Sequence, residues 1–169
     1  MVTLTSAGNY VFGAALVGLV VCAIVSDARR LTIPNWISIC LIVAFIIYVP
    51  LAGRQLPIVL HILVGLVAFA IGLAFFIIGW FGGGDVKFLA AVALWAGPEK
   101  IAHLTFIMSL VGAALSVAIL MMRGWLARYP DLPARSPFAA IASWARQGVC
   151  PYGIAIGLGA LATLPARFY

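Results

Sequence analysis

Residues 56–81 read LPIVLHILVGLVAFAIGLAFFIIGWF and contain no Asp, Glu, Lys or Arg. A helix needs about 20 predominantly apolar residues to cross the ~30 Å hydrocarbon core of a bilayer, so this stretch is long enough to span one. The rest of the chain shares its character, because 66% of the 169 residues are hydrophobic and only 8% are charged. An ordinary soluble domain has about 25% charged residues. We therefore predict an all-α, polytopic membrane protein and exclude the soluble classes.

Further apolar stretches on both sides of this one predict a bundle of about six transmembrane helices in one domain, residues 1–169. The predicted spans are residues 8–26, 36–52, 56–81, 86–98, 101–122 and 149–165. The fourth span is short and follows a run of three glycines, which predicts a helix that starts within the membrane region. Such a break is tolerated where protein or a watery cavity surrounds the backbone. The longest connection, residues 123–148, is either a loop or an interfacial segment.

The basic residues predict the orientation of these spans. One side of the predicted bundle carries Arg29, Arg30, Lys87, Arg123, Arg128, Arg135 and Arg146, and the other carries Arg54, Lys100 and Arg167. Because Lys and Arg accumulate on the cytoplasmic side of membrane proteins, the first side is expected in the cytoplasm and both chain ends outside. The basic residues lie singly or in pairs, which argues against nucleic-acid binding, since that needs a clustered electropositive face.

Two of the four acidic residues lie at the same predicted depth, at the cytoplasmic face. Asp27 follows the first span and Asp85 precedes the fourth. Each has a purely structural alternative: Asp85 as the N-cap of its helix, and Asp27 as a solvated partner of Arg29 or Arg30. The second alternative is the weaker one, because the dipole at a helix C-terminus disfavours an anion.

Taken together, the two acids suggest a protease pair. Two carboxylates held close in a poorly solvated cleft share one proton. The ionised group then accepts a proton from water while the protonated group polarises a peptide carbonyl. Because two carboxylates activate water directly, no metal and no other cofactor is expected. The three cysteines form no C-x-x-C pair, and His61 and His103 are expected at the membrane interface, far from the acids.

Three motifs resemble one known family. Residues 82–87, GGGDVK, resemble the GxGD signature of intramembrane aspartyl proteases, in the GxGDxK form of type IV prepilin peptidases. Residues 27–29 (DAR), followed by 33–35 (IPN), resemble the stretch that carries that family's first catalytic aspartate. Residues 151–153 (PYG), followed by Ala155 and Ile156, are similar to its C-terminal PYGxAI element. The motifs occur in the family's order over residues 27–156.

The resemblance implies the GxGD protease fold and assigns roles to particular residues. Asp27 and Asp85 would be catalytic. The motif residues that would support them are Gly82, Gly84, Lys87, Arg29, Asn35, Pro151, Tyr152 and Gly153. The implied activity is an aspartic endopeptidase of the bacterial inner membrane that removes the short basic leader from prepilins or pseudopilins at the cytoplasmic face.

The resemblance is closest to the small peptidases of Tad/Flp pilus systems. Larger members carry an N-terminal region with paired C-x-x-C motifs, linked to zinc and to N-methylation of the pilin. This sequence lacks those cysteines, so methyltransferase activity is not expected. Two other functions stay open from the residues alone: a small proton- or cation-coupled transporter that uses the same two acids, and a non-catalytic subunit of a pilus or secretion complex. The oligomeric state is also left open.

Overall fold

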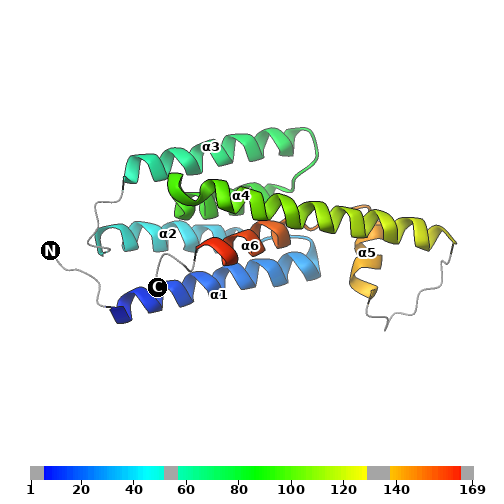
Figure 1. Ribbon diagram of the computed structural model, residues 1–169, viewed down its shortest axis with the longest axis horizontal. Coiled ribbons are helices and arrows are strands. Elements are labelled where there is room, and N and C mark those ends of the chain that lie inside the picture. The colour runs from blue at the N-terminus through cyan, green and yellow to red at the C-terminus, as the bar shows by residue number, and fades with distance from the viewer. Residues whose placement is uncertain (1–5, 52–56, 129–137, 165–169) are drawn as a thin grey trace.

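The computed structural model is all-α and describes residues 6–51, 57–128 and 138–164. The helices in these ranges are α1 (Ser6–Arg30), α2 (Asn35–Leu51), α3 (Ile58–Ile77), α4 (Gly83–Arg128), α5 (Ala139–Gln147) and α6 (Tyr152–Thr163). Apart from α5, the helices lie roughly along one long axis (Figure 1). The prediction of an all-α helical bundle is confirmed.

Three of the described helices are long and apolar enough to cross a membrane: α1 from Gly8 onward, α3 and α4. The helices α2 and α6 are apolar but shorter. Large apolar side chains point outward from the bundle, as on α3, where Val59 is 78% exposed and Ile77 is 75% exposed. Contiguous apolar surface of this kind is stable against lipid and unstable against water. The chain is therefore a membrane helical protein.

α4 consists of two helices joined at a sharp reversal. Gly97 has a non-helical backbone conformation (φ 62°, ψ −173°) and precedes Pro98. The chain turns back at this point, and its second half then runs past the ends of α1 and α3 toward α5 (Figure 1). The spans expected at residues 86–98 and 101–122 correspond to the two halves of α4.

Several helix ends differ from the ends of the expected spans. α1 continues to Arg30, so Asp27 lies in its last turn rather than after it. α4 continues to Arg128, and α5 occupies part of the expected connection 123–148. The span expected from residue 149 begins only at Tyr152, because Gly148 ends α5 in a left-handed conformation and Pro151 precedes the next helix. The basic residues Arg54, Arg135 and Arg167 lie outside the described residues.

The core lies between α1, α2, the first half of α4 and α6. Trp95 is 1% exposed, and its Nε1 donates a 2.8 Å hydrogen bond to the Leu41 carbonyl of α2. His61 of α3 is fully buried, with Nδ1 2.8 Å from the Leu94 carbonyl of α4. His61, which the sequence analysis expects at the membrane interface, has its ring buried between α3 and α4, where this hydrogen bond and the space beside Gly97 accommodate it.

One end of the bundle brings together several helix ends, among them three that carry or contact the acids. α1 ends there, and α4 and α6 begin there (Figure 1). We call this the site end. The start of α1 and the end of α6 lie at the opposite end. The first two acids of the chain, Asp27 in the last turn of α1 and Asp85 in the first turn of α4, are thereby placed at the same end of the molecule.

Candidate active site

Asp27 and Asp85 line the same cavity at the site end, with a volume of about 610 Å³. Its wall comes from the end of α1, the α3–α4 connection and the segment between α5 and α6. The lining residues are Asp27, Leu31, Gly79, Trp80, Phe81, Gly82, Asp85, Gly148, Val149, Cys150, Pro151 and Tyr152. The two carboxylates are close enough to interact electrostatically. The cavity therefore offers two carboxylates to one substrate segment.

Asp27 is held by the start of α6. Its side chain is only 3% exposed, whereas Arg29 and Arg30 are exposed, so the solvated-pair alternative is wrong. The backbone N–H groups of Gly153 and Ile154 interact with its carboxylate. Both N–H groups belong to the first turn of α6, where the helix dipole favours an anion, and that of Ile154 also donates to the Pro151 carbonyl at 3.2 Å. The start of α6 thus offsets the unfavourable position of Asp27 at the end of α1.

Gly153 is required by this close approach. A Cβ built on Gly153 would lie 2.7 Å from Asp27 Oδ2 and 2.6 Å from Ile33 Cδ1, both far inside van der Waals contact. Only glycine lets the first turn of α6 come this near to the carboxylate. Asp27 Oδ2 is buried and accepts no hydrogen bond from the described residues.

Asp85 lies in the first turn of α4. Its Oδ2 accepts a 3.1 Å hydrogen bond from the backbone N–H of Gly82, just before the helix. This is the carboxylate half of a capping box, in which an acidic residue in the first turn reaches back to the cap position. The N-cap alternative is therefore wrong in position, although the side chain does serve the helix start. The Gly153 N–H interacts with Asp85 as well as with Asp27.

Four of the motif residues do not line the described cavity: Lys87, Asn35, Gly84 and Arg29. Lys87 Nζ donates a 3.0 Å hydrogen bond to Asn35 Oδ1, which joins the start of α4 to the start of α2. Gly84 packs against the backbone of Ile33, with 2.9 Å from a Cβ built on it to the Ile33 oxygen. Arg29 is exposed at the end of α1 and does not line the described cavity.

Sequence reasoning missed Trp80 and Phe81, which line the cavity together with the expected Tyr152. Phe81 packs against Tyr152 with ring centroids 4.9 Å apart and against Phe75 at 5.3 Å. Trp80, which is 68% exposed, stacks on Phe75 at 5.7 Å. The position of Trp80 and Phe81 directly before the glycine run is the one signal that could have indicated a role at the site.

The described residues contain no group of three or more His, Cys, Asp or Glu side chains that could hold a metal ion. What the geometry presents is a pair of carboxylates, backbone N–H donors from two helix starts, and an aromatic wall. Such a pair is suited to activating a water molecule against a peptide carbonyl.

A model of the type IV leader peptidase family matches residues 14–117, more than half of the chain. The chain belongs to the type IV leader peptidase family. This family consists of aspartic prepilin peptidases, so the protein is an enzyme and prepilins are its class of substrate. Comparisons with curated proteins and with solved structures found no match.

For this type IV leader peptidase, the matched segment includes both candidate aspartates but ends before α6. Contact between the start of α6 and Asp27 therefore comes from the structure and not from the family match. Among the motif residues, Tyr152 and Pro151 line the cavity, and Gly153 contacts Asp27.

Proposed function

We propose that Asp27 and Asp85 are the catalytic pair of this prepilin peptidase. The observation that carries the proposal is their shared position in one cavity, each in contact with backbone N–H groups at a helix start. An acid that merely capped a helix would not need a second carboxylate beside it. Two carboxylates in one partly desolvated cavity favour the singly protonated pair, which acts as a unit.

The reaction follows from that protonation state. The ionised carboxylate accepts a proton from water, and the water oxygen attacks the carbonyl carbon of the scissile peptide bond. The protonated carboxyl donates a hydrogen bond to the carbonyl oxygen as negative charge develops on it. Collapse of the tetrahedral intermediate breaks the C–N bond, and a proton passes from the pair to the leaving amine nitrogen. Asp27 Oδ2, which has no described partner, is available to share the proton.

We further propose that the substrates are Flp-type prepilins, which the enzyme cuts just before their apolar helix. We also propose that the protein crosses a bacterial inner membrane six times, with the site end facing the cytoplasm. The resemblance of the three sequence motifs to the small peptidases of Tad/Flp pilus systems supports Flp-type prepilins as the substrates. The distribution of positive charge supports this orientation. Lys100 lies near the Gly97 reversal, at the end opposite the site. The basic residues at the site end or beyond it are Arg29, Arg30, Lys87, Arg123, Arg128 and Arg146.

The transporter alternative is less well supported. Coupling sites of secondary transporters lie near the middle of the bilayer, but both acids lie at one end of the bundle. Family membership also favours a peptidase over a non-catalytic subunit.

The test is leader removal in cells that lack any other prepilin peptidase. The Asp27→Asn and Asp85→Asn variants keep the side-chain size but lose the ionisable group, and each is expected to reduce cleavage by about 10²-fold or more. The control is Glu99→Gln, which changes an exposed acid near the opposite end. The measurement is the size shift of a co-expressed prepilin, with membrane levels of each variant checked by immunoblot. Full leader removal by either aspartate variant would show that the pair is not catalytic.

A further inference from the structure

The outer surface of the described bundle carries apolar grooves between neighbouring helices. One lies between α2 and α3, with a volume of about 510 Å³. Another, between α1 and α2, has about 310 Å³. The groove between α3 and the second half of α4 has about 320 Å³, and we call it the α3–α4 groove. Of these grooves, only the α3–α4 groove shares a lining residue with the catalytic cavity, and that residue is Phe81.

The α3–α4 groove runs along the bundle toward the site end. One wall is formed by residues 63–75 of α3, the other by residues 101–108 of α4, and Leu89 lies between them. At the helical rise of 1.5 Å per residue, the α3 wall extends for about 18 Å, more than half of the ~30 Å hydrocarbon thickness. The only polar side chain in the lining, Thr105, donates its hydroxyl to the Ile101 carbonyl of its own helix at 2.8 Å. The groove therefore suits an apolar occupant.

Phe81 and Tyr152 form the boundary between the α3–α4 groove and the cavity. Phe81 lines both spaces, and its ring packs on Tyr152, which lines the cavity. Phe75, at the end of the α3 wall, packs on the other side of Phe81. A chain that leaves the groove at this end passes Phe81 and reaches the cavity of Asp27 and Asp85.

We propose that the α3–α4 groove binds the apolar helix of the prepilin, so that the leader junction extends past Phe81 to the two aspartates. This inference rests on the proposed function. An apolar helix docks into a hydrophobic groove through side chains on one of its faces, and in lipid such packing is driven by van der Waals contact. The cleaved bond lies beside the N-terminal end of that helix, which fits a groove whose site end opens on the cavity.

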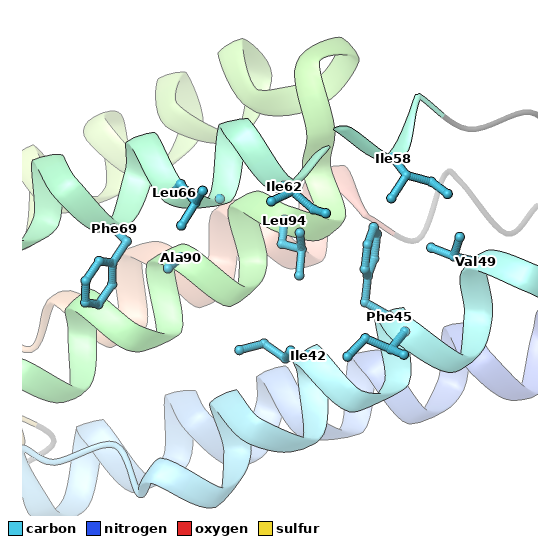
Figure 2. A pocket seen from close by; sticks show the side chains of 11 residues that line it. Ile42, Phe45, Val49, Ile58, Ile62, Leu66, Phe69, Ala90 and Leu94 are labelled. Carbon is cyan, nitrogen blue, oxygen red and sulfur yellow. The ribbon is translucent and has the colours of Figure 1, made fainter. Parts of the chain in front are cut away.

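The larger α2–α3 groove does not offer the same route. Figure 2 shows side chains of α2, α3 and the first half of α4 around it, among them Phe45, Phe69 and Leu94. None of its lining residues lines the cavity. A helix bound there would have no described residue in common with the catalytic centre, so we assign that surface to lipid.

Ala68 and Ala44 provide a matched pair of groove-filling substitutions. Ala68 lines the α3–α4 groove and Ala44 lines the α1–α2 groove of similar volume. Both alanines are half-buried and pack against the same core. Two probes separate docking from catalysis: a detergent-solubilised prepilin with a basic leader and one apolar helix, and a soluble peptide that covers the leader junction without the helix.

The Ala68→Phe variant is expected to lower kcat/KM for the full prepilin by at least about 10-fold, mainly through KM, because its ring occupies the docking space. Its cleavage of the short peptide is expected to equal that of the unaltered enzyme, and Ala44→Phe is expected to change neither substrate. Equal cleavage of full prepilin by Ala68→Phe and the unaltered enzyme would overturn the docking site. Equal loss on both substrates would also overturn it, because the defect would then lie in the catalytic centre.

Photo-crosslinking tests the same surface in an enzyme whose groove is not blocked by a substituted phenylalanine. Val67 of the α3–α4 groove and Val43 of the α1–α2 groove are 49% and 47% exposed. With a benzophenone side chain at either position in the Asp85→Asn background, the prepilin helix is expected to crosslink from position 67 and not from position 43. Adducts with lipid alone at position 67 would overturn the proposal. Failure of the unaltered enzyme to cleave either substrate would instead refute the proposed function, and the docking site with it.

Discussion

At the scale of single residues, Asp27 shows how a carboxylate in an unfavourable local position is retained. It lies in the last turn of α1, where the helix dipole opposes a negative charge. The compensation comes from Gly153 and Ile154, which present N–H groups at the start of another helix. One helix therefore supplies the acid and a different helix stabilises it.

Gly153 is the residue on which this contact depends, and its replacement by alanine is expected to disturb the catalytic pair. In Gly153→Ala the added Cβ would meet Asp27 Oδ2 and Ile33 Cδ1, so α6 or Asp27 must move. A displacement of about 1 Å at a reacting group costs about 10²-fold in rate, and we expect a loss of prepilin cleavage of that order. The measurement is kcat/KM on purified enzyme in detergent.

The control for this variant is Gly18→Ala. No atom lies within 4 Å of a Cβ built on Gly18, and alanine is the better helix former, so activity is expected to be unchanged. Gly153→Ala enzyme with the rate of the unaltered protein would contradict a role for this close approach.

The order of the apolar spans is sufficient to predict that Asp27 and Asp85 lie at the same end of the bundle. Consecutive spans cross in opposite directions, so the end of the first span and the start of the fourth lie on the same side. The side-chain partners could not be predicted in this way. The hydrogen bond between Lys87 and Asn35, and the burial of His61, depend on how α2, α3 and α4 pack. Periodicity in one segment contains no information about which residue of another segment lies opposite.

At the scale of helices, the reversal inside α4 organises the bundle. Gly97 adopts a backbone conformation that is essentially restricted to glycine, and Pro98 starts the returning helix. The His61 ring occupies the space into which a Cβ at position 97 would project. The first half of α4 then carries Asp85 at its start, and the second half forms one wall of the α3–α4 groove.

Replacing Gly97 by alanine is therefore expected to destabilise the fold. The backbone conformation alone costs about 1–3 kcal/mol for a residue with a Cβ, and the overlap with His61 adds to it. We expect a lower midpoint of thermal unfolding in detergent for Gly97→Ala.

Gly124→Ala, in the same helix and with no atom within 4 Å of the added Cβ, is expected to keep or slightly raise the midpoint, since alanine favours helix. Equal midpoints for Gly97→Ala and the unaltered protein would mean that the reversal tolerates a side chain.

Helix boundaries near the site were harder to predict than the helices themselves. The apolar run that begins at residue 149 hides the start of α6, because Val149 and Cys150 are apolar but precede Pro151. In the same way, the basic residues Arg123 and Arg128 suggested a connection, yet α4 remains helical through both. Charge indicates where a helix leaves the membrane, and it does not indicate where the helix ends.

At the scale of the whole molecule, the described basic residues are distributed unevenly along the bundle. Most of these basic residues lie at the site end, or on α5 and the part of α4 that extends beyond the site end (Figure 1). On the proposed orientation, in which the positive residues mark the cytoplasmic side, the cavity faces the compartment that holds the basic leader of a prepilin.

Reporter fusions test that orientation. A fusion after Arg30 is expected to report the cytoplasm, and a fusion after Lys100 the outside, using an enzyme pair active on opposite sides of the membrane. The reverse pattern would put the cavity on the outer face and contradict cleavage of the leader in the cytoplasm.

The contact between α6 and Asp27 also has a consequence for the order in which the enzyme is made. Both carboxylates belong to helices that leave the ribosome early, whereas the N–H groups that hold Asp27 belong to the last described helix. During synthesis the pair therefore enters the membrane without the helix start that stabilises it. On the proposed mechanism, the growing chain does not cleave other membrane proteins until α6 has been translated and has packed against Asp27.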